Sequence, residues 1–415
     1  MSDIQEQEQS SVAEQSVASA VERPEYIRRR TIGELLRGDL GFLPVLFTLA
    51  LVVLFFAITT NGVFLEPYNL SNLAQQAAET GIVGLGSILV LLLGEIDLSV
   101  AAVAMLCSGF MAVCSERLGY PAGVAILVAL LSGALIGAIN GFLVAVVRIP
   151  SFIVTLAALI FYSGLLLALL NGQATLPISN AFILAISGSP QSFLPDIYGV
   201  GLPALAVVLY AIALLLGYMR RRRLGLRTQS LRRIILQIVI VAVLVGAAVT
   251  AFESYNGVPY STAILFGLIL LFWLLLTKTA FGRHMYAVGG NVEAARRAGI
   301  NVVGIRIAAF TLCSVLAAIG GIIEASRTNA VATQINTELL LDAIAAAVIG
   351  GVSLFGGRGS VWAIVLGILV IESLENGLTL RSAGTDIQNM VEGIVLMIAV
   401  ASDALLRRFQ SRSGR

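Results

Sequence analysis

Long apolar segments separated by short polar ones make up almost the whole chain after residue 40. Most of these segments approach the ~20 residues that a helix needs to cross a bilayer. The pattern therefore predicts an all-α polytopic membrane protein with roughly 10–12 transmembrane helices. The expected apolar segments are 41–60, 77–93, 98–114, 122–147, 152–170, 202–219, 234–251, 260–276, 302–323, 339–349, 361–373 and 387–400.

Glycine interrupts the apolar pattern at two places. Segments 77–93 and 98–114 are joined by residues 94–97 (Gly-Glu-Ile-Asp), and segment 339–349 ends at the glycine-rich stretch 350–359. In membrane transporters, corresponding breaks in two halves of a repeat point to the substrate path. We therefore expect two broken or re-entrant segments in an internal repeat. The alternative is two unrelated glycine-rich turns.

Polar side chains in and near the breaks are candidates for a substrate pathway, because ionisable groups at membrane depth are costly and usually functional. Glu95 and Asp97 are the two carboxylates of the first break. In a second interpretation, both are hydrated at the surface of a hairpin or cap the following helix. The pathway candidates are Glu95, Asp97, Ser99, Asn140, Asp342, Ser353, Glu375 and Asn376.

The longest polar interruption in the second half of the chain is the loop 279–301. Lys278 and three arginines place positive charge beside two apolar segments, and such charges mark the cytoplasmic side. Asn291 is a suitable helix N-cap and Gly299 a suitable C-cap, so a short helix with a charged face is predicted between them. Such a helix is suited to docking on a soluble partner.

The distribution of charge also predicts the orientation of the remaining segments. Four consecutive arginines at 220–223 are expected in the cytoplasm, whereas 171–201 has no lysine or arginine and is expected outside. Residues 1–40, rich in Gln, Glu and Ser, predict a disordered cytoplasmic tail before a membrane domain at 41–408. Residues 409–415 are a second cytoplasmic tail, so both termini are predicted to be cytoplasmic.

Composition supports a membrane protein and excludes several functions. The chain is 58% hydrophobic and 12% charged, with a mean hydropathy of +0.94, whereas soluble domains average about 25% charged residues. Its only lysine, Lys278, follows threonine, so no P-loop for ATP hydrolysis is present. With the single histidine His284, we expect no catalytic residues, no metal site and no cofactor. The arginine run lacks interleaved aromatic residues, so nucleic acid is not an expected partner.

Several phrases of the chain resemble a known family. Residues 293–299 (Glu-Ala-Ala-Arg-Arg-Ala-Gly) fit the EAA-x-x-x-G pattern of ABC importer permeases, in a loop like that of the sugar permeases of the ribose and xylose type. Residues 95–100, 150–156 and 342–357 also resemble this family, and the extra length is closest to the xylose-type branch. The resemblance covers 41–408. It departs from the family at Ala101, where glycine is usual, and at 305–312, where many such loops have proline.

The resemblance implies a permease subunit in a bacterial plasma (inner) membrane that imports a monosaccharide such as xylose or ribose. Its implied partners are ABC ATPase subunits, a periplasmic or lipid-anchored sugar-binding protein, a second copy of itself, and membrane lipid. The loop 279–301 would then be the coupling loop on the ATPase. The residues implied in ATPase docking are Arg283, Asn291, Glu293, Ala294, Ala295, Arg296 and Gly299.

Two alternatives stay open at the level of sequence. An ion-coupled secondary transporter would need carboxylates at mid-membrane, and Glu95 with Asp97 would serve. An ABC permease for branched-chain amino acids would share the coupling loop but carry a different cargo.

Overall fold

The structure is a computed structural model whose described residues are 43–188, 191–226, 230–391, 393–395, 397–398 and 401. The predicted tails 1–40 and 409–415 lie outside these residues, as does part of the predicted last segment 387–400. Within the described residues, nine helices are long and apolar enough to cross a membrane, and the shorter helix α3 (Leu43–Thr59) is also apolar. The prediction of an all-α polytopic membrane protein is therefore confirmed.

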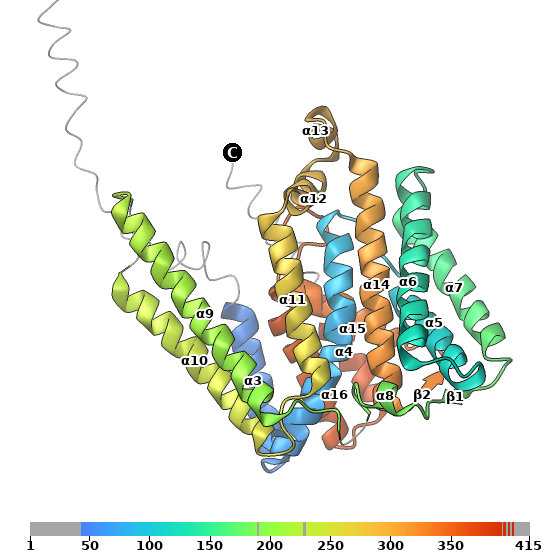
Figure 1. The fold of residues 1–415 in the computed structure, drawn as a ribbon, viewed down its shortest axis with the longest axis horizontal. Coiled ribbons are helices and arrows are strands. Elements are labelled where there is room, and N and C mark those ends of the chain that lie inside the picture. The colour runs from blue at the N-terminus through green and yellow to red at the C-terminus, as the bar shows by residue number, and fades with distance from the viewer. Residues whose placement is uncertain are drawn as a thin grey trace, which may run out of the picture. The chain divides into compact units, whose positions relative to one another are not determined.

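The described elements follow one another with short connections (Figure 1). After α3 they are η1 (Val63–Leu65), α4 (Pro67–Leu92), α5 (Val100–Ala112), η2 (Val113–Arg117), α6 (Ala122–Ala145), α7 (Ser151–Leu169), β1 (Thr175–Pro177), α8 (Ala181–Leu184), α9 (Asp196–Arg223), α10 (Leu231–Glu253), α11 (Tyr260–Lys278), α12 (Ala280–Gly290), α13 (Val292–Arg297), α14 (Val302–Thr328), β2 (Ala330–Ala332), α15 (Thr337–Ile349) and α16 (Ala363–Leu380).

Helix α14 is the central element of the bundle and packs against α4, α5 and α6. On α6, Gly133, Gly137 and Gly141 recur every four residues and face α14. A Cβ atom added at Gly137 would lie only 2.4 Å from the carbonyl oxygen of Phe310. Small residues at this spacing let two membrane helices approach closely, so dispersion contacts replace the hydrophobic effect that lipid cannot supply.

Two helices are longer than the apolar pattern predicts. Helix α4 starts at Pro67, ten residues before the predicted segment, with proline in the first turn, where its missing N–H costs nothing. Helix α14 continues to Thr328, so Glu324 and Arg327, which follow the predicted segment 302–323, are helical. In both cases polar residues beyond the predicted segment have partners inside the bundle: Asn69 bonds to Asn376, and Arg327 pairs with Glu79. A prediction from hydropathy alone therefore makes the two helices too short.

The breaks lie where the glycines predict them. The first separates α4 from α5 at residues 93–99, and the second separates the 13-residue α15 from α16 at residues 350–362. Helix α4 is a full 26 residues long, so the first break ends a complete span and does not interrupt a short one. That the two breaks belong to an internal repeat stays a prediction.

Helices α9 and α10 pair with each other and expose most of their apolar side chains. Only 6% of the apolar window of each helix is buried. Such a surface is tolerated where hydrocarbon replaces water, and all backbone groups of a helix are satisfied internally. This hairpin supports the prediction that membrane lipid is a partner of the chain.

The first testable prediction concerns the contact between α6 and α14. Gly137→Ala places a methyl group against the backbone of α14, and we expect a loss of about 1–3 kcal/mol in unfolding stability from overpacking. Gly123→Ala is the matched control, because nothing lies within 4 Å of a Cβ atom there on the same helix. Denaturation of the purified proteins in detergent compares the two. Equal stability of both variants would show that the close approach is not required.

Candidate functional site

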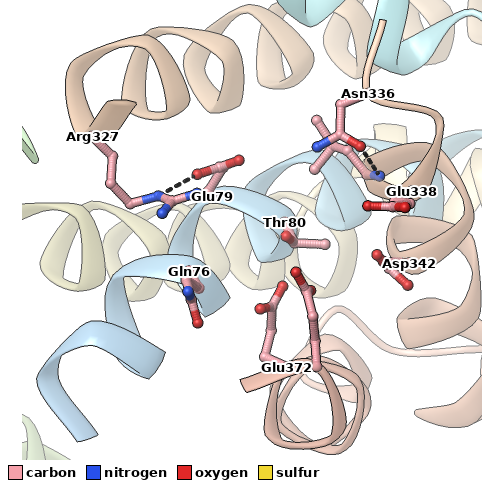
Figure 2. A pocket seen from close by; sticks show the side chains of 10 residues that line it. Gln76, Glu79, Thr80, Arg327, Asn336, Glu338, Asp342 and Glu372 are labelled. Atoms are coloured by element: carbon pink, nitrogen blue, oxygen red, sulfur yellow. Dashed lines mark hydrogen bonds and ion pairs between the residues drawn. The ribbon is translucent and has the colours of Figure 1, made fainter. Parts of the chain in front are cut away.

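A polar cavity lies among α4, α14, α15 and α16 (Figure 2). Its empty volume is about 370 Å³, including the part open to solvent. Nine of its ten lining residues are polar: Gln76, Glu79, Thr80, Arg327, Asn336, Glu338, Asp342, Glu372 and Glu375, with Leu339 as the tenth. The cavity lies near the C-terminal end of α14, which β2 follows; α13 precedes the opposite end of that helix (Figure 1).

Helical spacing brings these side chains to one place. On α4, Gln76, Glu79 and Thr80 are three and four residues apart and therefore share one face. Asn336 caps α15 by accepting a hydrogen bond from the Leu339 amide (3.1 Å), and Asp342 lies one turn further along that helix. On α16, residues 372 and 375 are again three apart. Four helices thus each present one polar stripe to the same hollow.

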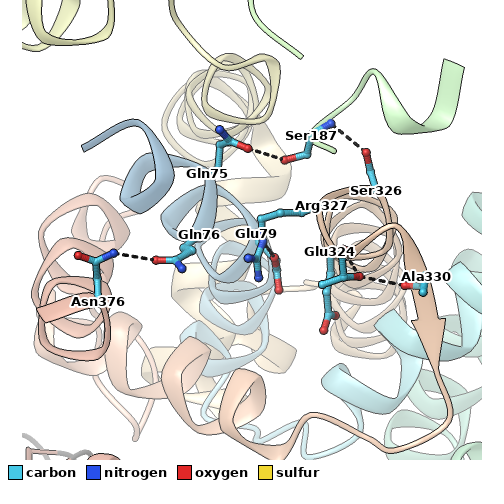
Figure 3. Close-up of polar contacts among 10 residues, drawn as sticks. Gln75, Gln76, Glu79, Ser187, Glu324, Ser326, Arg327, Ala330 and Asn376 are labelled. Carbon is cyan, nitrogen blue, oxygen red and sulfur yellow. Dashed lines mark hydrogen bonds and ion pairs between the residues drawn. The ribbon is translucent and has the colours of Figure 1, made fainter. Parts of the chain in front are cut away.

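One ion pair and an amide chain connect the walls of the cavity (Figure 3). Arg327 on α14 donates from Nε to Oε2 of Glu79 on α4 at 2.9 Å, and the Glu79 side chain is only 5% exposed. Asn376 on α16 donates to Oε1 of Gln76 (3.5 Å) and accepts from Asn69 (2.8 Å). At the cavity, these polar contacts join α4 to α14 and α16 in addition to the apolar packing between the helices.

The lining has the chemistry of a site for a neutral, hydroxyl-rich molecule. Its five carboxyl groups are hydrogen-bond acceptors, and the guanidinium of Arg327 with the amides of Gln76 and Asn336 supplies donors. No group of three or more His, Cys, Asp or Glu among the described residues is arranged to hold a metal ion. The donors and acceptors of the lining suit hydrogen bonding to a small polar molecule.

A separate polar network surrounds the first break. The Asp97 carboxylate accepts hydrogen bonds from the amide (2.8 Å) and hydroxyl (2.6 Å) of Ser99 at the start of α5. Asn140 of α6 donates to Ser99 (3.2 Å) and accepts from Tyr162 of α7 (2.9 Å). Glu95 forms an ion pair with Arg306 of α14 at 2.9 Å. These groups fix the broken backbone and join it to three helices.

The predicted pathway residues therefore separate into two sets. Asp342 and Glu375 line the cavity, and Asn376 lies beside it. Glu95, Asp97, Ser99, Asn140 and Ser353 lie instead at the breaks, at the end of α14 that follows α13, and none of them lines the cavity. Asp97 is only 4% exposed and accepts both hydrogen bonds from Ser99, the residue before α5, so it is not hydrated at a surface. Its role in a substrate pathway stays a prediction.

The predicted docking loop contains two helices, α12 and α13. Asn291 accepts a hydrogen bond from the Ala294 amide (2.9 Å), and Gly299 has φ +81°, so the predicted caps of α13 are confirmed. Gly289 and Gly290 are the last two residues of α12. Helix α12 forms because its buried Met285 and Val288, three residues apart, pack into the core cluster that α4 shares.

Six of the seven predicted docking residues are exposed: Arg283, Asn291, Glu293, Ala294, Arg296 and Gly299. The seventh, Ala295, is only 4% exposed and anchors α13 to the bundle. Glu293 pairs with Arg296 (3.4 Å) and Arg297 (3.1 Å), which are three and four residues away on the same helical face. Helix α13 therefore presents a polar surface of mixed charge outside the apolar bundle.

Comparison with known proteins places the chain in a family. The family model described as "Branched-chain amino acid transport system / permease component" matches residues 69–400. The xylose transport system permease protein of Escherichia coli (strain K12) is 40% identical over 357 residues, which cover 86% of this chain and 90% of that protein. The chain belongs to this permease family.

Two further relatives of the permease carry other sugars in their names. The ribose import permease protein of Escherichia coli (strain K12) is 31% identical over 356 residues, 86% of this chain and 92% of that protein. The fructose import permease protein of Rhizobium meliloti is 31% identical over 367 residues, 88% of this chain and 85% of that protein. No solved structure gives a significant match. The relatives are all named as transport components, and the permease is accordingly a multi-pass protein of the inner membrane.

Seven polar lining residues of the permease were not among the predicted pathway residues. Two of them had a signal in the sequence. Glu79 and Glu372 lie inside the predicted apolar segments 77–93 and 361–373, and an acidic residue at such a position is a functional candidate. The remaining five resemble ordinary loop or helix residues until the fold brings them together: Gln76, Thr80, Arg327, Asn336 and Glu338.

The second testable prediction concerns the ion pair across the cavity. Arg327→Leu leaves the buried carboxylate of Glu79 without its partner, and we expect a loss of about 3–5 kcal/mol in unfolding stability. The double variant Glu79→Leu/Arg327→Leu removes both charges and should recover most of that loss. Arg296→Leu breaks an exposed pair and should unfold like the wild type. Denaturation in detergent measures these three variants together with Glu79→Leu and the wild type; additive effects of the two cavity substitutions would contradict the pairing.

Proposed function

We propose that the permease is the membrane subunit of an ATP-driven ABC importer and forms the translocation pathway for a monosaccharide, with D-xylose as the first candidate. The observation that carries this proposal is the 40% identity to the xylose permease over 86% of the chain. At that identity and coverage, the bundle, the breaks and the docking loop are expected to correspond in the two proteins.

The polar cavity supports a sugar as cargo. A pentose is neutral and carries several hydroxyl groups, each of which both donates and accepts a hydrogen bond. Carboxylates such as those of Asp342 and Glu375 accept such bonds, and Arg327 donates them. An apolar amino-acid side chain would find one apolar partner in this lining, Leu339. The lining therefore favours a polyol over a branched-chain amino acid.

The docking loop supports an external source of energy. Helix α13 projects an exposed, charged surface, while α12 beneath it is packed into the core. The chain contains no P-loop, so ATP hydrolysis has to come from a separate ATPase. We propose that α13 inserts into this ATPase in the cytoplasm. The cavity then lies toward the outer surface, where a sugar-binding protein delivers the cargo, and a second copy of the permease completes the pathway.

One alternative cargo has a specific observation in its favour. The matching family model is described by branched-chain amino acid transport. L-leucine is therefore the competing substrate, and it differs from xylose in carrying an apolar side chain and two charged groups.

The third testable prediction is the transport activity itself. The permease, co-expressed with the ATPase and binding protein encoded beside it, is reconstituted in vesicles with ATP on the ATPase side. We expect uptake of radiolabelled D-xylose that requires ATP and continues when ionophores collapse ion gradients. D-ribose, D-fructose and L-leucine are measured in parallel. Uptake of L-leucine alone would overturn the sugar assignment, and uptake lost with the ion gradient while ATP remains would identify a secondary transporter.

The fourth testable prediction concerns docking on the ATPase. Glu293→Ala/Gly299→Ala removes an exposed carboxylate and strains a residue at φ +81°. We expect the variant to insert normally but to lose co-purification of the ATPase and ATP-driven uptake. Glu66→Ala/Gly62→Ala is the matched control. It changes an exposed glutamate, which precedes the first residue of α4, and a glycine at φ +90°.

The same preparation separates docking from the cargo path. Glu375→Gln in the cavity should keep the ATPase bound while it weakens D-xylose uptake. Full sugar-stimulated ATP hydrolysis in the Glu293/Gly299 double variant would contradict the assignment of α13 as the docking helix.

A further inference from the structure

The two breaks, which lie more than 250 residues apart in the chain, touch each other through their backbones. The Gly357 amide of the second break donates a hydrogen bond to the carbonyl of Leu92, the last residue of α4 (2.9 Å). A Cβ atom added at Gly356 would lie 2.7 Å from the Gly94 nitrogen, which leaves no room for a side chain. Gly94 itself has φ +75°, a conformation that glycine adopts without strain.

The C-terminal end of α12 meets the breaks at the same point. A Cβ atom added at Gly289 would lie only 1.8 Å from the Leu92 carbonyl oxygen and 2.7 Å from the Gly357 nitrogen. One added at Gly356 would lie 2.9 Å from the Gly289 carbonyl oxygen. Three chain segments therefore converge at van der Waals contact of their backbones. We call the four residues Gly94, Gly289, Gly356 and Gly357 the glycine junction.

A side-chain contact ties the same face of α12 to the second break. The Tyr286 hydroxyl, three residues before Gly289, donates to the carbonyl of Gly359 at 2.9 Å. Burial raises the pKa of Tyr286, so its phenol stays protonated and keeps the donor. Met285 and Val288 are fully buried beside these residues. Helix α12 is thus held to the breaks by one hydrogen bond and by close backbone contact.

The junction also lies at the ends of helices that line the polar cavity. Helix α4 runs unbroken from Gln76 at the cavity to Leu92 at the junction. Helices α15 and α16, which carry Asp342 and Glu372, are joined by the second break. A displacement of α12 would therefore act directly on three of the four helices that form the cavity.

We propose that the glycine junction transmits movement of α13 to both breaks, and that Gly289 and Tyr286 are the positioning residues of this contact. The proposal rests on the proposed function, because it needs an ATPase to move α13. It adds a specific route: the force passes through α12 into the backbones of the two breaks, by close contact at Gly289 and by the hydrogen bond from Tyr286. A merely structural junction would affect the stability of the fold and leave the coupling of ATP hydrolysis to transport unchanged.

The test compares two neighbouring glycines in the reconstituted complex of permease, ATPase and binding protein. Gly289→Ala places a methyl group inside the junction, whereas Gly290→Ala, the next residue in the chain, meets nothing within 4 Å. We expect Gly289→Ala to keep the ATPase bound but to transport about tenfold less D-xylose per ATP hydrolysed, because overpacking displaces α12 from the breaks. Gly290→Ala should match the wild type.

A milder variant tests the junction independently of whether Gly289→Ala folds. Tyr286→Phe removes one hydrogen-bond donor and keeps the ring, and we expect a fall of roughly two- to tenfold in the same ratio. If Gly289→Ala and Tyr286→Phe lower the thermal stability of the complex but leave the amount of sugar transported per ATP unchanged, the junction is only structural and the proposal is wrong.

A second readout does not depend on the identity of the cargo. A bimane label at Ser360→Cys, an exposed position of the second break, is introduced with Cys114→Ser, since Cys107 and Cys313 are buried. A non-hydrolysable ATP analogue should shift the label's emission in the otherwise unchanged complex and in Gly290→Ala, and not in Gly289→Ala. If no sugar is transported but this pattern holds, the proposed cargo fails and the junction stands. A shift that persists in Gly289→Ala overturns the junction.

Discussion

A helix that breaks inside an apolar bundle frees backbone N–H and C=O groups, and each of these needs a partner because lipid offers none. The permease meets this constraint by placing its two breaks against each other. The Gly357 amide binds the Leu92 carbonyl, and Ser353 and Arg358 close the second break with their own backbone hydrogen bond (3.0 Å). Side chains complete the first break, where the Ser151 hydroxyl accepts from the Ile96 amide at 3.3 Å. The paired breaks lie at the ends of α4 and α15 and at the starts of α5 and α16.

The same constraint explains why polar side chains gather in two separate regions. Polar groups near the breaks bond to the backbone or to other side chains: Asp97 accepts from the Ser99 amide, and Asn140 accepts from the Tyr162 hydroxyl. Groups at the far end of the bundle surround a hollow, where Arg327 pairs with Glu79 and four further carboxyl groups are part of the lining. A buried ion pair does little for net stability. The concentration of carboxyl groups at this end of the bundle is therefore not explained by a gain in folding stability.

The sequence predicted the elements well and the site only in part, for a physical reason. Helices and breaks depend on local properties of the chain, so segment length and the positions of glycines predict them. The caps of α13 at Asn291 and Gly299 are predictable for the same reason. The cavity depends on residues from 76 to 375 that meet only in the folded bundle. Polarity beside a glycine does not identify the lining of the cavity, since polar groups nearest a break, such as Asp97, bond to the backbone there. Arg327 was missed because its polar surroundings resemble a loop.

The distance between the cavity and the glycine junction limits how a displacement at one can reach the other. Thr80 lines the cavity and Leu92 lies at the junction, twelve residues apart on one continuous helix, or about 18 Å at 1.5 Å per residue. Only a rigid element carries displacement over such a distance, and α4 is both unbroken and almost wholly buried between these points. Its glycines press it against the neighbouring helices: a Cβ atom added at Gly86 would lie 2.9 Å from the Cys313 carbonyl oxygen of α14. A helix packed this closely moves as one body with its neighbours or does not move, because a close-packed interior resists gradual deformation. Opening of the cavity should therefore be a discrete step of the helices around α4, and a separation of α4 from α14 at the cavity would have to break the Glu79–Arg327 pair.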